Sequence, residues 1–260
     1  MEALDLPHLD KGPRSGTVTI ILLHGFPLDH TMWAPQVHAL EAAGFRVIAP
    51  DLRGLGKAPL GKGPAAMPLH AADIIRLADR VGVRRFAIAG FSMGGYVALE
   101  LARSSLDRLA GLALVDTRAE PDPPEAARGR VETAAKVRAQ GSQVVADAML
   151  PKLLTPRAPP ALVEQTRAVM LAQRPEGVAQ CLLGMAERID QRPNLSRIRV
   201  PTLVVVGAED TITPPDAARV LADGISGSRL VTVPGAGHLS TLEQADAVSA
   251  AMVEWGKMLR

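Results

Sequence analysis

Cysteine is almost absent from this 260-residue sequence, in which Cys181 is the only one. A single cysteine excludes a disulfide within the chain and a metal site built from several thiolates. No group of His, Cys, Asp and Glu residues has the spacing of metal ligands either. We therefore expect a protein that works without a metal ion or another cofactor.

Aromatic residues and excess charge are also scarce. Phe, Trp and Tyr make up 3% of the residues, so the core has to be built from Ala, Val, Leu and Ile. The formal net charge is +2, and no dense block of Lys and Arg is present. Because proteins that bind nucleic acid usually carry a basic patch, we expect no nucleic acid partner.

Long apolar runs are missing as well. The longest, Val18–Leu23, is far too short to span a membrane. Met1–Gly16 contains acidic residues and prolines and lacks the apolar stretch of a secretory signal. We expect a cytoplasmic protein that does not insert into a membrane, with an extended arm over residues 1–16.

The sequence does contain short apolar runs that alternate with helical patterns. Its length allows one large domain, with or without an insertion. Because the apolar runs are continuous, each is expected to be a strand covered on both faces. This pattern predicts an α/β fold with a mostly parallel central sheet and helices on both faces. The expected strands cover residues 17–23, 46–51, 86–89, 109–115, 201–207 and 229–233.

The alternation is interrupted after residue 117. Residues 118–195 show no strand pattern, and prolines divide them into helical segments. Four helices are predicted there, over residues 124–140, 142–150, 160–173 and 175–190. The chain then consists of a core, residues 1–117 and 196–260, and a helical insertion. We favour a cap (lid) whose apolar side chains, such as Met185, shape a substrate pocket; the alternative is a helical decoration without functional consequence.

Ser92 is the first candidate for chemistry. The expected strand 86–89 leads into Gly90-Phe-Ser-Met-Gly-Gly95, which continues as a small-residue helix through Leu101. A G-x-S-x-G pattern between a strand and a helix is typical of a nucleophile elbow, whose tight turn requires almost side-chain-free neighbours. The alternative is an ordinary serine at a strand–helix junction, because the bare pattern also occurs by chance.

A serine hydroxyl is a poor nucleophile near neutral pH and needs a base, with an acid behind that base. His238 is the candidate base, because it lies on a glycine-rich loop after the last expected strand. His24 ends a strand but is followed at once by a turn. The other histidines lie in helical or terminal contexts and are expected to be surface or packing residues: His8, His30, His38 and His70.

Two aspartates are candidates for the acid. Asp210 follows the penultimate expected strand, and Asp116 follows the strand after the elbow. We favour Asp210, because it gives the chain order serine, aspartate, histidine. Asp51 is better explained as a carboxylate that accepts hydrogen bonds from its own turn, beside Arg53.

The negative charge of a tetrahedral intermediate needs preset hydrogen-bond donors. The amide of Met93 heads the elbow helix, where the helix dipole favours negative charge. The second donor is expected in the loop after the first strong strand, at the amide of Phe26. All these residues lie at the carboxyl ends of expected parallel strands, where open α/β sheets place their sites.

Two helix starts are predicted from local patterns. Thr213 precedes Pro214 and is expected to cap the next helix. Ser240 and Glu243 have the spacing of a capping box at the start of the closing helix.

From about residue 17 to its end, the chain resembles the α/β-hydrolase superfamily, in particular its small lidded serine esterases and enol-lactonase-like members. The resemblance implies Ser92 as nucleophile, His238 as base and Asp210 as acid, with the amides of Phe26 and Met93 as oxyanion hole. The motifs that carry it occur in order: His24-Gly-Phe-Pro27, Asp51-Leu-Arg-Gly-Leu-Gly56, Gly90-Phe-Ser-Met-Gly-Gly95, Gly207-Ala-Glu-Asp210 and Gly237-His238.

The chain also departs from this pattern. The family commonly opens with a β-hairpin, for which 16 residues are barely enough, so the sheet edge is expected to be shortened. Lys57 stands where a small residue often follows the Asp-x-Arg-Gly-x-Gly turn. Enol-lactonases usually carry an Asn-Ser-Leu-Gly-type oxyanion loop, whereas this chain has His24-Gly-Phe-Pro27. That difference favours a carboxylesterase.

The predicted function is therefore a serine hydrolase that cleaves carboxylic esters of small or medium acyl groups through an acyl-enzyme. The expected partner is a small-molecule ester or lactone, and the oligomeric state is left open. A serine nucleophile argues against dehalogenases and epoxide hydrolases, which use a carboxylate. The same scaffold also hosts lactone hydrolases, cofactor-free perhydrolases and carbon–carbon bond hydrolases. A non-catalytic binding protein is the alternative from another class.

Overall fold

A seven-stranded sheet forms the centre of the computed structural model, which describes residues 3–14 and 18–259. The strand order is β1-β3-β2-β4-β5-β6-β7, and only β1 runs antiparallel to its neighbour. The predicted α/β fold with a mostly parallel sheet is therefore confirmed. The strands are β1 (His8–Lys11), β2 (Thr19–Leu23), β3 (Arg46–Pro50), β4 (Phe86–Phe91), β5 (Leu109–Val115), β6 (Thr202–Gly207) and β7 (Arg229–Val233).

The N-terminal segment differs from the predicted extended arm. Its residues His8–Lys11 form the edge strand β1, which pairs with β3 and is fixed by an ion pair between Asp10 and Arg46, 2.8 Å long. A single strand stands there in place of a hairpin, as expected for a shortened edge. Thr17, the predicted first residue of the next strand, lies outside the described residues.

Apolar side chains on the central strands alternate between two core clusters, one on each face of the sheet. Ile21 and Leu23 face one cluster, whereas Ile20 and Leu22 face the other. This explains the continuous apolar runs, because both faces are covered by helices. One face carries α2 (Met67–Arg80), α3 (Met93–Ser104) and α9 (Pro215–Gly224), and the other carries α1 (Ala34–Ala42) and α11 (Ala245–Lys257).

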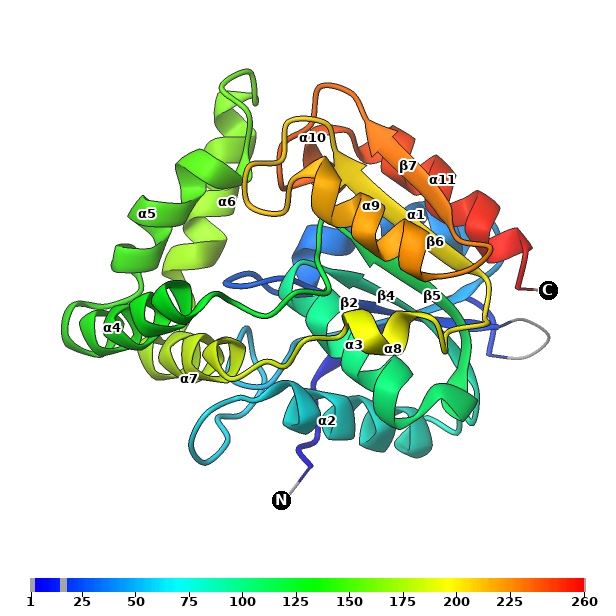
Figure 1. Ribbon diagram of the computed structural model, residues 1–260, viewed down its shortest axis with the longest axis horizontal. Helices are drawn as coiled ribbons and strands as arrows, with labels where there is room; N and C mark the ends of the chain where they lie inside the picture. Colours follow the sequence, from blue (N-terminus) through cyan, green and yellow to red (C-terminus); the bar gives the residue numbers. More distant parts are fainter. Residues whose placement is uncertain (1–2, 15–17, 260) are drawn as a thin grey trace.

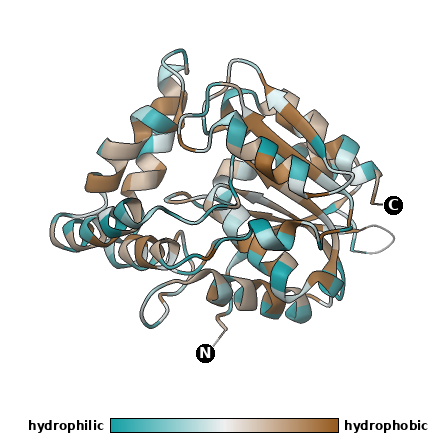
Figure 2. Cartoon of the chain, in the orientation of Figure 1, coloured by the Kyte–Doolittle hydropathy of each residue, from teal (hydrophilic) through white to brown (hydrophobic). Residues whose placement is uncertain are grey.

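The helical insertion, residues 118–195, is fully described and contains no strand. Figure 1 shows α4 (Pro124–Gln140), α5 (Gln143–Leu153), α6 (Pro160–Leu171) and α7 (Pro175–Ala186) at the left, beyond the ends of the strands, whereas α8 (Arg192–Leu195) lies nearer the middle of the view. In Figure 2 α4 is mostly hydrophilic, whereas α5 and α6 are largely apolar. α4 packs on α7, and α5 packs on α6. The four predicted helices are present, with a short fifth: α4 (Pro124–Gln140), α5 (Gln143–Leu153), α6 (Pro160–Leu171), α7 (Pro175–Ala186) and α8 (Arg192–Leu195).

Backbone contact joins the insertion to the core. A Cβ atom on Gly184 of α7 would lie 1.9 Å from the carbonyl oxygen of Ala65, and one on Gly177 would lie 1.8 Å from that of Gly54. Only glycine permits an approach this close, so α7 rests directly on the loop between β3 and α2. Among the described residues, no helix is both long enough and apolar enough to cross a membrane.

Candidate active site

Ser92 lies in a tight turn between β4 and α3. Its φ of 50° is in the left-handed region that residues other than glycine rarely adopt. A Cβ on Gly90 would lie 2.3 Å from the Gly94 carbonyl oxygen, and one on Gly94 would lie 2.3 Å from that of Leu23. The two glycines of the predicted elbow are therefore required sterically, and the strained turn holds Ser92 at its tip, partly exposed.

The structure brings the three predicted side chains together from distant parts of the chain. His238 Nε2 lies 2.9 Å from Ser92 Oγ, and His238 Nδ1 lies 2.8 Å from Asp210 Oδ2. His238 is 1% exposed and packs against the ring of Phe91, with ring centroids 5.1 Å apart. The result is a continuous hydrogen-bonded chain from a hydroxyl through an imidazole to a carboxylate, the arrangement that activates a serine as a nucleophile.

The Asp210 carboxylate is held by its own loop. Its Oδ1 accepts hydrogen bonds from the amides of Ile212 and Thr213, 2.8 and 2.9 Å long, and its Oδ2 accepts one from the Thr213 hydroxyl, 2.6 Å long. Burial would raise the pKa of Asp210, but the hydrogen bonds from His238 and Thr213 outweigh it and keep that pKa below its ordinary value. Asp210 is thus an ionised partner for His238.

The predicted cap at Thr213 is wrong. Its side chain bonds Asp210, and α9 begins at Pro215 after Pro214 without a side-chain cap. Thr213 Oγ1 also lies 3.2 Å from His238 Nδ1. A residue expected to cap the start of a helix instead completes the hydrogen bonding of the Asp210 carboxylate.

Asp116, the other candidate acid, does not contact the imidazole through a hydrogen bond. One of its carboxyl oxygens accepts from the Gly207 amide at 2.8 Å, and the other accepts from the Ser240 hydroxyl. It is fully buried, and burial together with the charge of Asp210 raises the pKa of Asp116 well above its ordinary value. Asp116 therefore ties the end of β6 to α10 (Ser240–Glu243).

The predicted capping box at Ser240 and Glu243 is also wrong. Ser240 is the first residue of α10, and its hydroxyl bonds Asp116. The Glu243 carboxylate accepts hydrogen bonds from Thr155 and Gly237. The closing helix is divided, since α10 ends at Glu243 and α11 begins at Ala245.

The two predicted oxyanion donors lie beside the serine. Met93 is the first residue of α3. A Cβ on Gly25, the residue before Phe26, would lie 3.2 Å from Ser92 Cβ, so this loop touches the elbow. Within the described part of the chain, neither the Phe26 amide nor the Met93 amide donates to another group. Neither amide is thus committed to another acceptor within the described residues.

His24 is a buried residue with a structural role that we did not predict from the sequence. Its Nε2 accepts a hydrogen bond from the Leu52 amide at 2.8 Å, and its Nδ1 lies 2.9 Å from the Gly25 oxygen. Burial lowers the pKa of His24 and favours the neutral ring that can accept. This imidazole joins the loop after β2 to the loop after β3 and so supports the position of Phe26.

Asp51 stabilises its own turn, as expected from the sequence. It accepts from the Lys57 amide at 2.9 Å and lies 2.6 Å from His30 Nδ1. Asp29, His30 and Asp51 form the one group in residues 3–14 and 18–259 whose ligand atoms are close enough for a metal ion. Because the Asp51 oxygens are already engaged by neighbouring donors, the group is explained by the turn.

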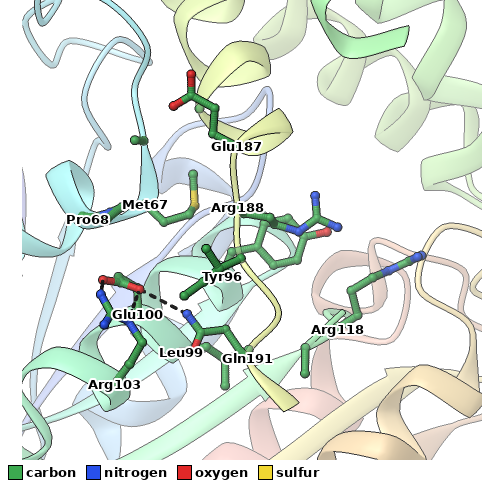
Figure 3. Close-up of a pocket in the computed structure, with 14 residues that line it drawn as sticks. Met67, Pro68, Tyr96, Leu99, Glu100, Arg103, Arg118, Glu187, Arg188 and Gln191 are labelled. Carbon is green, nitrogen blue, oxygen red and sulfur yellow. Dashed lines mark hydrogen bonds and ion pairs between the residues drawn. The ribbon is translucent and has the colours of Figure 1, made fainter. Parts of the chain in front are cut away.

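A cavity of about 210 Å³ lies between α2, α3 and residues 184–191. Figure 3 shows the Tyr96 ring beside it, with the Arg188 guanidinium 4.3 Å from the ring centroid. Below them, Glu100 bonds Arg103 and Gln191. Tyr96 is one helical turn beyond the serine, but none of the three catalytic candidates lines this cavity. The sequence patterns did not reveal it, because its residues come from separate elements.

Comparison with known proteins supports the resemblance seen in the sequence. Residues 18–245 match the family model of the alpha/beta hydrolase fold. The chain belongs to this family. Among alpha/beta hydrolases of known structure, a thermophilic esterase from Thermogutta terrifontis, solved with malate bound, is 43% identical, with a TM-score of 0.94 over 98% of this chain and 93% of the other.

Enol-lactonases are also similar to this alpha/beta hydrolase. The structure of the enol-lactonase from Burkholderia xenovorans is 34% identical, with a TM-score of 0.89 over 96% of this chain and 95% of the other. The 3-oxoadipate enol-lactonase 2 of Acinetobacter baylyi is 30% identical over 85% of this chain and 82% of its own length. The superfamily and the branch indicated by the sequence are thus confirmed.

The two aspartates lead to different expectations on substitution. Asp210→Asn should lower kcat by about 10⁴-fold, which is the loss seen when the triad aspartate of a serine protease is changed to asparagine and the histidine takes the wrong tautomer. Asp116→Asn should lower kcat by less than about tenfold, because an amide side chain can accept from the Gly207 amide and donate to the Ser240 hydroxyl. Esterase assays on both folded variants test this, and the opposite ranking would assign the acid to Asp116.

Proposed function

We propose that this alpha/beta hydrolase cleaves carboxylic esters through an acyl-enzyme intermediate on Ser92. The observation that carries the proposal is the hydrogen-bonded chain from Ser92 Oγ through His238 to Asp210, at 2.9 and 2.8 Å. His238 Nε2 takes the hydroxyl proton as Ser92 Oγ attacks the ester carbonyl carbon. Asp210 orients the ring and stabilises its positive charge.

The tetrahedral intermediate and its breakdown follow from the same groups. The carbonyl oxygen becomes an oxyanion that accepts hydrogen bonds from the amides of Phe26 and Met93. His238 then gives its proton to the leaving alcohol, whose bond to carbon breaks and leaves the acyl group on Ser92. A water molecule, deprotonated by His238, repeats the attack and releases the carboxylic acid, so the cycle uses no cofactor.

A lactone is the second candidate substrate. A lactone is an internal ester, and the same nucleophile and base would open it. The similarity to the two enol-lactonases supports this reading, whereas the higher identity to the thermophilic esterase favours an open-chain ester. The substrate in either case is a small molecule with one ester bond within reach of Ser92.

Turnover by Ser92→Ala tests the proposal. Removing the nucleophile should lower kcat for p-nitrophenyl acetate by about 10⁴-fold or more, while the variant stays folded. An organophosphonate should label the wild-type chain on Ser92, as read by mass spectrometry of peptides. A fully active alanine variant, or a label on another residue, would contradict the assignment. Absence of any turnover by the wild-type chain would favour a non-catalytic binding protein.

We also propose that the helical insertion is a cap that limits the acyl group. A hollow of about 20 Å³ lies between α6 and the core, lined by Val169 of α6, Leu28 and Leu239. Because Leu239 follows the base and Leu28 lies two residues after Phe26 in the chain, we propose that the acyl group extends toward this hollow. Met185, in contrast, is 2% exposed and belongs to the core, so its substitution would report mainly on stability.

Enlarging this hollow should change acyl preference. Val169→Ala should raise the ratio of kcat/KM for hexanoyl over acetyl esters by about tenfold, since one or two methylenes in an apolar pocket contribute about that discrimination. Leu171→Ala is the matched control, because Leu171 lies on the same helix but is 40% exposed. Equal ratios in both variants and the wild type would show that α6 does not limit the acyl group.

A further inference from the structure

We infer that Glu243 is a positioning residue that couples the helical insertion to the catalytic base. The inference rests on the proposed function, because it assigns Glu243 a part in holding His238. Glu243 ends α10, and its carboxylate bridges two segments that are far apart in the chain. One is Thr155, just after α5, and the other is Gly237, the residue before His238.

The bridge uses both carboxylate oxygens. Oε1 accepts from the amide and from the hydroxyl of Thr155, each at 2.7 Å, and Oε2 accepts from the Gly237 amide at 2.7 Å. Hydrogen bonds to an ionised carboxylate are roughly twice as strong as neutral ones. Glu243 is only half-buried, but Thr155 is 7% exposed, so the bonds to Thr155 are largely shielded from water.

The residue after His238 is bonded to the same part of the insertion. The Leu239 amide donates to the Leu153 oxygen at 2.8 Å, and both side chains are fully buried. A Cβ on Gly237 would lie 3.2 Å from Glu243 Oε2 and 3.4 Å from the Leu153 oxygen. The backbone on either side of the imidazole is therefore held by the end of α5, directly or through Glu243.

An ion pair on the surface also links this end of the insertion to the core, but it contributes less. Arg157 pairs with Glu209, next to the acid, but both side chains are exposed, at 63% and 42%. Exposed ion pairs contribute little because water and salt screen them. Glu243 is thus the charged group through which a movement of α5 would be transmitted to the imidazole, and its loss should impair the base while leaving the nucleophile and the acid in place.

The test compares Glu243→Ala and Glu243→Gln with wild type in p-nitrophenyl acetate hydrolysis. Glu243→Ala should lower kcat by about tenfold or more, because misplacing a reacting group by about 1 Å costs up to about 10²-fold, while KM changes less than about twofold. The kcat of Glu243→Gln should lie between those of Glu243→Ala and wild type, because the amide oxygen can accept from one segment but not from both. Thr155→Val removes one of the three bonds and should lower kcat too, but by less than Glu243→Ala.

The matched control is Glu254→Ala, which removes an exposed carboxylate that bonds Lys257 on the same surface helix, and it should leave kcat unchanged. In the Asp210→Asn background, Glu243→Ala should not lower kcat any further, since the base is already disabled. Glu243→Gln, which conserves volume, is judged by the same criteria if the alanine variant does not fold.

Two outcomes would overturn the inference. One is a folded Glu243 variant with wild-type kcat, and the other is an equal loss of kcat in the wild-type and Asp210→Asn backgrounds. Failure of the proposed function is seen separately, as hydrolysis that survives Ser92→Ala in the same assay. The two failures are therefore distinguishable.

Discussion

The site depends on how closely the backbone segments after neighbouring parallel strands can approach one another. The turn after β4 touches the end of β2, where Gly94 meets the Leu23 carbonyl, and the end of β6 touches the loop after β7, where a Cβ on Gly207 would lie 2.0 Å from the Gly237 oxygen. Side chains larger than a hydrogen atom would separate these loops. With them apart, the imidazole could not reach the serine and the carboxylate at once.

Polar side chains, some of them buried, then fix the segments that the glycines bring together. Asp116 joins the Gly207 amide to Ser240, His24 joins Leu52 to the loop that carries Phe26, and Glu243 joins the insertion to Gly237. His24 and Asp116 are fully buried, and at these two places an unpaired donor would be costly. Ser92, His238 and Asp210 themselves contribute few of these bonds, so their geometry is set largely by residues to which we assign no part in proton transfer.

Much of the fold could be predicted from the sequence because its signals are local. Continuous apolar runs mark strands covered on both faces, and the elbow glycines form a motif contained within six residues, although the contact that requires Gly94 is with the distant Leu23 carbonyl. The proximity of Ser92, Asp210 and His238 followed from one rule, that parallel strands end at one edge of the sheet. These inferences required no knowledge of long-range contacts.

The misread features share one physical cause. Thr213 and Ser240 fit local capping patterns, but each hydroxyl is oriented to donate to a buried carboxylate and accepts no capping bond, and the carboxylate that Ser240 bonds, Asp116, is 124 residues away. Strand β1 carries polar side chains and forms only because β3 offers an open edge. The cavity beside Tyr96 is likewise assembled from distant segments, and no local pattern indicates such sites.

We propose that Ser92, His238 and the amides of Phe26 and Met93 form one reacting centre. A crystal structure of the chain after reaction with an organophosphonate tests it most directly. We expect phosphorus bonded to Ser92 Oγ, with the phosphonyl oxygen within hydrogen-bond distance of the amides of Phe26 and Met93 and the imidazole of His238 beside the leaving-group position. A phosphonyl oxygen directed away from both amides, or an adduct on another residue, would contradict it.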